Sequence, residues 1–214
     1  MQYKNNSTLV LIAIFTLFFS QISNLAFAED ENESEVPVWA LDGATATSVE
    51  TQKPLYQIGG ATATLKRNEH KIKIKVDTAG LPLGAYTNWW ILYNQPSNCA
   101  AAVCQLSDLF NPNTDASILW AAGAIIEGKK AHFKAKLSVG EIPGQLFFGD
   151  GLTNALGAQV QYIIKWHGPT SEDPDVLYDQ LHNIADPNCE TAPLPGLTGL
   201  GRCPDLQASD MFMP

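Results

Sequence analysis

The chain has 214 residues, with 22 acidic and 13 basic side chains, and a formal net charge of −9 at pH 7. An acidic chain binds poorly to nucleic-acid phosphates or to anionic membranes, and the sequence shows no cluster of Lys and Arg that would override this balance. We therefore expect no nucleic-acid partner.

The first 28 residues are typical of a secretory signal peptide. They place Lys4 near the start, an apolar run at Leu9–Phe19, and the small-x-small sequence Ala26-Phe27-Ala28 at the end. The apolar run is shorter than the roughly 20 residues of a transmembrane span. We expect cleavage, a mature chain of residues 29–214 with a formal charge of −10, and a secreted or periplasmic protein without a transmembrane segment. An uncleaved signal anchor is the alternative.

The mature chain divides into a short leader and one domain. Residues 29–37, EDENESEVP, are acidic and nearly free of apolar side chains, which predicts a disordered leader. Residues 38–214 are long enough to form a single domain with its own core.

The clearest pattern predicts a β-hairpin between residues 61 and 76. Apolar and polar residues alternate in both of its runs, and Arg67-Asn68-Glu69 lies between them. The inward residues are Ala61, Ala63, Leu65, Ile72, Ile74 and Val76, and the outward ones include Lys71, Lys73 and Lys75.

A second hairpin is predicted from LWAAGAII through the turn Glu127-Gly128-Lys129. Its second strand would point Ala131, Phe133, Ala135 and Leu137 inward and His132, Lys134 and Lys136 outward. A third strand, AQVQYIIKWHG, would place Val160, Tyr162, Ile164 and Trp166 on one face, with Gln159, Gln161 and Lys165 on the other.

Strand-like runs recur along the chain, and the linkers between them carry Gly, Pro and Asn. These features predict an all-β fold, a single antiparallel β-sandwich or barrel. A short helix is expected in QLSDLF or in DVLYDQLHNI. From Asp186 onward, Pro and Gly are frequent, which indicates an irregular C-terminal strap.

An even count of four cysteines in an exported chain favours disulfides. Three pairings are possible. We predict Cys99–Cys104 and Cys189–Cys203, because each pair brackets its own turn-rich loop, so the second would tie the C-terminal strap. A four-cysteine zinc site is the rival, but no C-x-x-C spacing supports it. We predict no metal and no cofactor.

The run Asn88-Trp89-Trp90-Ile91-Leu92-Tyr93-Asn94 is apolar on both faces of a strand. This pattern favours a central strand that is covered on both sides. An aromatic ligand platform is the alternative.

Among the four histidines, His167 is the only catalytic candidate, because it closes an apolar strand just before the Gly168-Pro169 turn. No G-x-S-x-G motif is present, and no serine has an informatively spaced histidine. An enzyme, a small periplasmic hydrolase or isomerase, would use His167 as general acid/base. It would require a carboxylate or hydroxyl within about 3 Å, in a cleft that holds substrate.

Four motifs together resemble a group of uncharacterised exported bacterial β-domain proteins. They are TAGLPLGAYTNWWILYNQPSNC, C-x-L-S-DLFNP, G-DGLTNALGAQVQYIIKWHGP and GRCPDLQ, and they extend from about Ala61 to Gln207. The hairpin and the HGP sequence at a strand end are more distantly similar to the chordin-type (CHRD) β-domain. CHRD domains often carry two histidines at that motif, where this chain has His167 alone. The resemblance implies a β fold and export, and it implies no reaction.

The sequence therefore favours an exported, non-catalytic β-domain that acts as a binding or cell-envelope interaction module. We expect a monomer or small homo-oligomer whose partner is a small molecule, a glycan or a protein. The predicted binding residues are Trp90, Tyr93, Asn94 and His167, in a loop cluster that also contains the Cys99–Cys104 bridge. Loops tied by a disulfide are preorganised for recognition.

Overall fold

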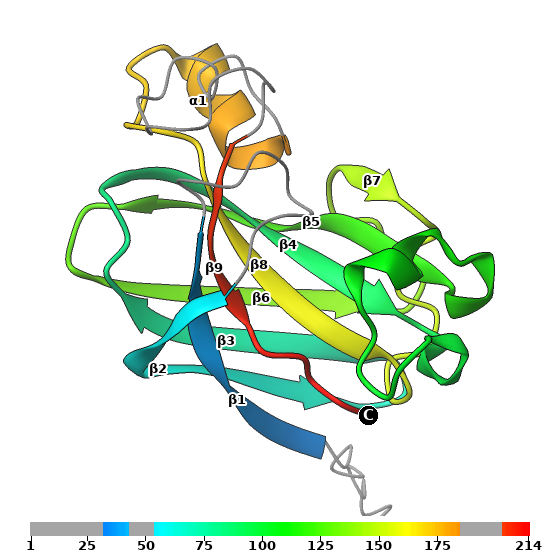
Figure 1. Ribbon diagram of the computed structural model, residues 1–214. Coiled ribbons are helices and arrows are strands. Elements are labelled where there is room, and N and C mark those ends of the chain that lie inside the picture. Colours follow the sequence, from blue (N-terminus) through cyan, green and yellow to red (C-terminus); the bar gives the residue numbers. More distant parts are fainter. Residues whose placement is uncertain (1–31, 43–53, 185–202) are drawn as a thin grey trace, which may run out of the picture.

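The computed structural model describes residues 32–42, 54–184 and 203–214 (Figure 1). Within these ranges the chain forms nine strands, one α-helix and three short 3-10 helices. The strands are β1 (Asn32–Leu41), β2 (Pro54–Arg67), β3 (Lys71–Ala79), β4 (Gly84–Tyr93), β5 (Ala116–Ile126), β6 (Lys130–Ser138), β7 (Leu146–Phe148), β8 (Gln159–Trp166) and β9 (Asp205–Ser209). The helices are α1 (Pro174–His182), η2 (Pro96–Asn98), η3 (Leu106–Phe110) and η4 (Pro112–Thr114). No helix in these ranges is long and apolar enough to cross a membrane.

All nine strands belong to one antiparallel sheet with the order β6-β3-β2-β1-β9-β8-β4-β5-β7. The sheet curls, so that its two halves pack face to face (Figure 1). For example, the rings of Tyr86 on β4 and Phe133 on β6 lie 6.5 Å apart, although these strands are far apart in the sheet order. The all-β prediction is confirmed.

The first predicted hairpin is confirmed as β2 and β3. Leu65 pairs with Ile74 and Ala63 with Val76, and all four side chains are buried in the main core. The turn is closed by Asn68, whose Oδ1 accepts the backbone N–H groups of residues 70 and 71 at 3.0 Å each.

The second predicted hairpin is wrong in its pairing. β5 pairs with β4 and β7, and β6 pairs along its whole length with β3, from Lys71 opposite Ser138 to Ala79 opposite Lys130. The predicted inward and outward faces of β6 are nevertheless correct, because alternation depends only on the local backbone. The three residues after β5 carry the chain from one half of the curled sheet to the other.

Two predictions about the ends of the domain need correction. The leader predicted as disordered over residues 29–37 is strand from Asn32 onward, and β1 pairs with β2 there. The C-terminal strap contains β9, which lies inside the sheet between β1 and β8. Backbone pairing with β2 orders the leader residues from Asn32 onward, and pairing with both β1 and β8 orders β9, in spite of their composition. Residues 185–202, which include most of the predicted strap, lie outside the described residues.

Strand β4 is covered on both faces, as the apolar run predicts. Trp90 and Leu92 face the main core between the two halves of the sheet. Trp89 faces the opposite side, in a smaller apolar cluster with Ile163 and Ala208. The helix α1 covers part of this second face, where its Leu181 carbonyl accepts the Trp120 indole N–H at 2.9 Å. Both predicted helical segments are observed, as η3 and α1.

Candidate functional site

His167 lies buried beneath the surface, directly after β8. Its Nε2 atom lies 2.6 Å from Thr87 Oγ1, and its Nδ1 atom lies 2.9 Å from Cys203 Sγ. Thr87 Oγ1 also accepts the Trp89 indole N–H at 2.7 Å, so this hydroxyl links Trp89 to the His167 ring.

This geometry meets only half of the requirement for the predicted general acid/base. A hydroxyl lies within reach of His167, but the side chains of both His167 and Thr87 are completely buried. The hollow described below is formed by other strands and does not include either residue. We therefore assign His167 a structural role, in which it joins β4 to the segment that begins at Cys203.

Asn94 has a similar structural role at the other end of β4. It is fully buried, and its side chain makes four hydrogen bonds to backbone groups. Nδ2 donates to the carbonyls of Asp115 and Gly151 at 2.8 and 2.9 Å, and Oδ1 accepts the N–H groups of Thr153 and Asn154 at 3.0 and 3.3 Å. This one amide therefore joins the loop between β4 and β5 to the loop between β7 and β8.

The remaining predicted binding residues, Trp90 and Tyr93, are also buried. Trp90 packs edge-on against Tyr162, with ring centroids 5.1 Å apart, and Tyr93 donates its hydroxyl to the Gln105 carbonyl at 2.9 Å. Burial raises the pKa of the Tyr93 phenol well above its ordinary value. A ligand in solvent reaches none of the four predicted binding residues in this conformation.

The predicted loop cluster does not form. Since β4 and β8 are antiparallel, Tyr93 pairs with Gln159 while Tyr86 pairs with Trp166. Asn94 and His167 consequently lie at opposite ends of the strand pair, about 30 Å apart at 3.3 Å per residue, because His167 lies opposite Ala85.

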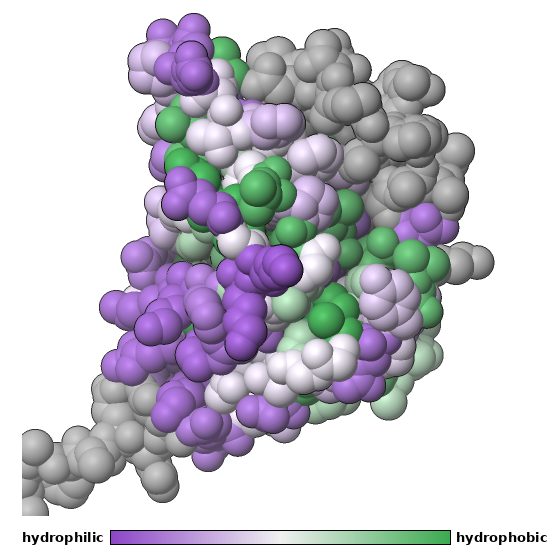
Figure 2. Space-filling model, turned by 90° about the vertical axis from the view of Figure 1, so that its left-hand side faces the viewer, coloured by the Kyte–Doolittle hydropathy of each residue, from purple (hydrophilic) through white to green (hydrophobic). Residues whose placement is uncertain are grey.

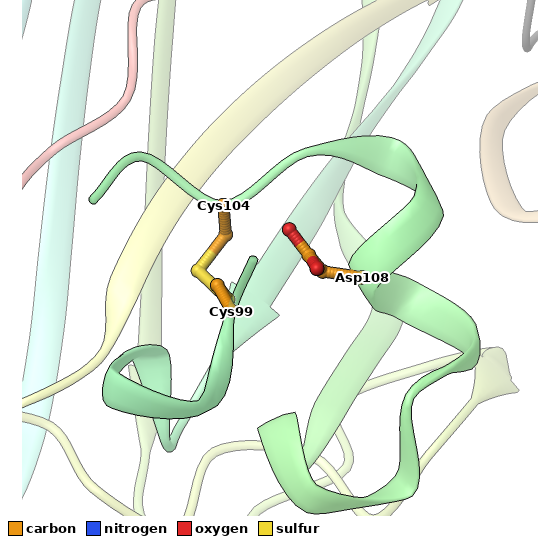
Figure 3. Close-up of side chains that lie close together, drawn as sticks. All are labelled: Cys99, Cys104 and Asp108. Atoms are coloured by element: carbon orange, nitrogen blue, oxygen red, sulfur yellow. A yellow bond between two sulfur atoms is a disulfide. The ribbon is translucent and has the colours of Figure 1, made fainter. Parts of the chain in front are cut away.

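The predicted Cys99–Cys104 disulfide is confirmed (Figure 3). Cys203 is also disulfide-bonded, and its predicted partner Cys189 lies outside the described residues. Asp108 lies beside the first bridge, and these three residues form the only potential metal-ligand group among the described residues. However, the two sulfurs are bonded to each other, and the Asp108 carboxylate accepts the N–H groups of Ala100 and Gln105 at 3.1 and 2.7 Å. The sulfurs are therefore not available as thiolate ligands, and the Asp108 carboxylate stabilises the loop.

A buried ion pair that the sequence did not indicate joins β8 to β9. Lys165 Nζ lies 2.6 Å from Asp205 Oδ1, and the two side chains are only 5% and 6% exposed. Lys165 also donates to the Cys203 carbonyl at 2.8 Å. Sequence alternation placed Lys165 on the correct face, but its partner comes from a segment 40 residues away.

Among the described residues, an exposed hollow rich in lysine lies on the outer side of β1, β2, β3 and β6. Its volume is about 580 Å³. Its lining contains five lysines, which we call the lysine face: Lys66, Lys73, Lys75, Lys134 and Lys136. Glu33, Thr64, Ile74 and Ala135 complete the lining. In Figure 2, hydrophilic residues are gathered toward the lower left of the surface in view.

The strand register explains why these lysines meet. Lys73 lies directly opposite Lys136, and Lys75 lies directly opposite Lys134. Lys66 on β2 lies directly opposite Lys73 on the other side of β3. Side chains directly opposite each other have Cβ atoms about 5 Å apart. The expectation that the chain has no basic cluster is therefore wrong, because five of its 13 basic residues line one hollow.

Two carboxylates among the described residues contact the lysine face at its margins. Glu33 pairs with Lys66 at 2.8 Å, and Asp77 contacts both Lys75 and His132. Hydrogen bonds from Lys75 and then from His132 lower the pKa of Asp77 below its ordinary value.

The two lysines of β6 differ from those neighbours. Among the described residues, neither Lys134 nor Lys136 forms an ion pair with a carboxylate. The hollow itself holds five lysines against one glutamate, an excess of positive charge in an acidic chain.

The alternating lysines in KIKIK and KAHFKAK were visible in the sequence, but they indicated only two solvent-facing strands. What the sequence did not provide was the pairing of these two strands with each other. No protein-family model, curated protein or solved structure matches this chain, so the assignment of function depends on its own geometry.

Proposed function

We propose that this protein is an exported, non-catalytic β-domain that acts as a binding module, and that it binds anionic ligands at the lysine face. The observation that carries the proposal is the hollow of about 580 Å³ lined by five lysines. A volume of this size lies within the range of ordinary ligand sites. The excess positive charge attracts anions within about 8 Å at physiological salt, although the whole chain is acidic.

Without a bound anion, the arrangement of the lysines destabilises the sheet. Like charges directly opposite each other destabilise an antiparallel pair, and β3 and β6 contain two such pairs in succession. Lysines on an edge strand also oppose edge-to-edge aggregation, which accounts for those on β6. It does not account for Lys66, Lys73 and Lys75, because β2 and β3 are interior strands. A bound anion would offset the repulsion on all three strands.

The proposal is tested by measuring the affinity of the mature chain, residues 29–214, for dextran sulfate by isothermal titration calorimetry. The test variant is Lys134→Gln/Lys136→Gln, and the matched control is Lys129→Gln/Lys130→Gln. The control removes the same charge from the other end of β6 and the preceding turn, outside the hollow lining. We expect the test variant to lose about tenfold or more in affinity, equivalent to about 1.4 kcal/mol, and the control to change little.

A variant that is expected to raise the affinity, instead of lowering it, strengthens this test. Glu33→Gln removes the one carboxylate in the lining, so its affinity for dextran sulfate should rise. Equal losses in the test and control variants would show that only the overall charge matters and would overturn the proposed site. No binding by the unaltered chain at low salt would overturn the proposed function.

A further inference from the structure

We propose that the ligand of the lysine face is a linear acidic polysaccharide, whose carboxylate groups lie along β3 and β6. This inference rests on the proposed function and specifies the class of ligand. Four observations on the hollow support it: the spacing of the charges, the depth of the site, the residue types in the lining, and the position of its polar groups.

The charges form rows that run along the strands. Lys73 and Lys75 follow each other on β3 at a spacing of about 7 Å, which is two residues of extended chain. Lys136 and Lys134 repeat this spacing on β6 at about 5 Å from the first row. A ligand with regularly repeated negative charges can contact both rows along their length.

The shape of the site favours a chain over a flat surface. Ile74 and Ala135 belong to the lining although their side chains face the core, so the hollow reaches down to the strands between the lysines. A lipid bilayer would touch the lysine ends without filling this space. The lining also lacks the large exposed apolar side chains that interfacial segments insert into membranes. A polymer chain can enter the hollow lengthwise.

The residue types in the lining disfavour nucleic acid. Sites for single-stranded nucleic acid combine positive charge with aromatic rings on which bases stack, and arginine adds planar, bidentate contacts to phosphate. The lining contains neither an aromatic residue nor an arginine. Lysines act as point charges and pair equally well with carboxylates.

The polar groups of the lining complement sugar hydroxyls. Glu33 and Thr64 lie on the β1 and β2 side of the hollow, opposite the lysines of β6. A carboxylate repels a ligand that is anionic on every side, but it accepts hydrogen bonds from hydroxyl groups. An acidic sugar carries both kinds of group on each unit, so its carboxylates can face β3 and β6 while its hydroxyls face Glu33.

The inference is tested with oligogalacturonates of two to eight units, which are linear and carry one carboxylate per unit. We expect affinity to rise with length and to level off once the oligomer spans the lysine face. Methyl-esterified oligomers of the same length should bind about tenfold more weakly or not at all, and Lys134→Gln/Lys136→Gln should reduce affinity for the acid form about tenfold. Raising NaCl from about 50 to about 200 mM should also weaken binding by on the order of tenfold or more.

Two comparison ligands separate this inference from the proposed function. One is a single-stranded oligonucleotide of the same total charge, and the other is a vesicle that contains phosphatidylserine. If either binds more tightly than the oligogalacturonate, the ligand class is wrong. If dextran sulfate binds through Lys134 and Lys136 but no oligogalacturonate does, the ligand class fails while the proposed function stands. If no anion binds to the unaltered chain, both fail.

Discussion

Replacement of Asn94 by alanine should destabilise the fold severely. The side chain is completely buried, and its four hydrogen bonds join the end of β4 to the backbone at Asp115, Gly151, Thr153 and Asn154. Alanine leaves two carbonyls and two N–H groups without these partners in the interior. Each unsatisfied buried group costs about 1 kcal/mol or more, so the expected loss is about 3–4 kcal/mol. The free energy of unfolding of a domain is typically about 5–15 kcal/mol, which makes this a large fraction.

Urea denaturation, followed by tryptophan fluorescence, measures the loss as a shift of the midpoint at constant slope. Hydrogen exchange should also show faster exchange of the Thr153 and Asn154 amides, which donate to the missing oxygen. The matched control is Asn98→Ala, because the exposed Asn98 side chain donates only to the Asn113 carbonyl. A loss of less than about 1 kcal/mol for Asn94→Ala would refute the reasoning, since a surface substitution alone costs about 0.5 kcal/mol or less.

The isosteric variant Asn94→Asp adds a dependence on pH. It replaces the two N–H donors with an oxygen that faces the carbonyls of Asp115 and Gly151. Burial and these carbonyls raise the pKa of the introduced carboxyl above its ordinary value of about 3.9, so the folded chain holds the proton more tightly than the unfolded chain. The variant should therefore be least destabilised near pH 4 and lose stability as the pH rises towards 7. A loss that is independent of pH would show that the carbonyls turn away.

Three further variants test other parts of the structure. Lys165→Met should cost about 3–5 kcal/mol because it removes the ion pair with the buried Asp205, and Lys165→Met/Asp205→Leu should recover most of that loss. Both are measured by urea denaturation, and equal stability of the two variants would contradict this. Cys99→Ala/Cys104→Ala should lower the free energy of unfolding by about 2 kcal/mol, which is the loop-entropy value for so short a loop. An unchanged melting temperature would exclude a role of this disulfide in stability. Lys134→Gln should raise the free energy of unfolding by up to about 1 kcal/mol at low salt, because it removes a like charge opposite a lysine of β3. This gain should vanish at high salt. A loss of stability at low salt would argue against repulsion between the lysines.

The features predicted correctly from the sequence are those that depend on short stretches of chain. Alternation with a period of two assigned the buried and exposed faces of β3 and β6, since neighbouring side chains of any strand point to opposite faces. It also separated the two faces of β8, although both of these are buried. The Cys99–Cys104 bridge was predictable because both residues belong to one short loop. The apolar run of β4 correctly indicated a strand with a core on each face.

The candidate site was beyond prediction because it depends on which strands are neighbours. The turn between β5 and β6 suits a hairpin, yet β6 pairs with β3, more than 50 residues earlier in the chain. The pairing of β6 depends on competition among all strands for partners, and no local sequence pattern indicates its outcome. The same holds for Asn94 and His167, which looked like loop residues available to a ligand but are buried by segments distant in sequence.

The sequence by itself determined the β class, the faces of the main strands and the first disulfide, because these follow from local backbone geometry and loop length. Only the tertiary structure decided that β9 lies inside the sheet, that Lys165 has a buried partner, and that the lysines of three strands line one hollow. These features arise from contacts between distant segments, whose free energies depend on the whole arrangement of the sheet.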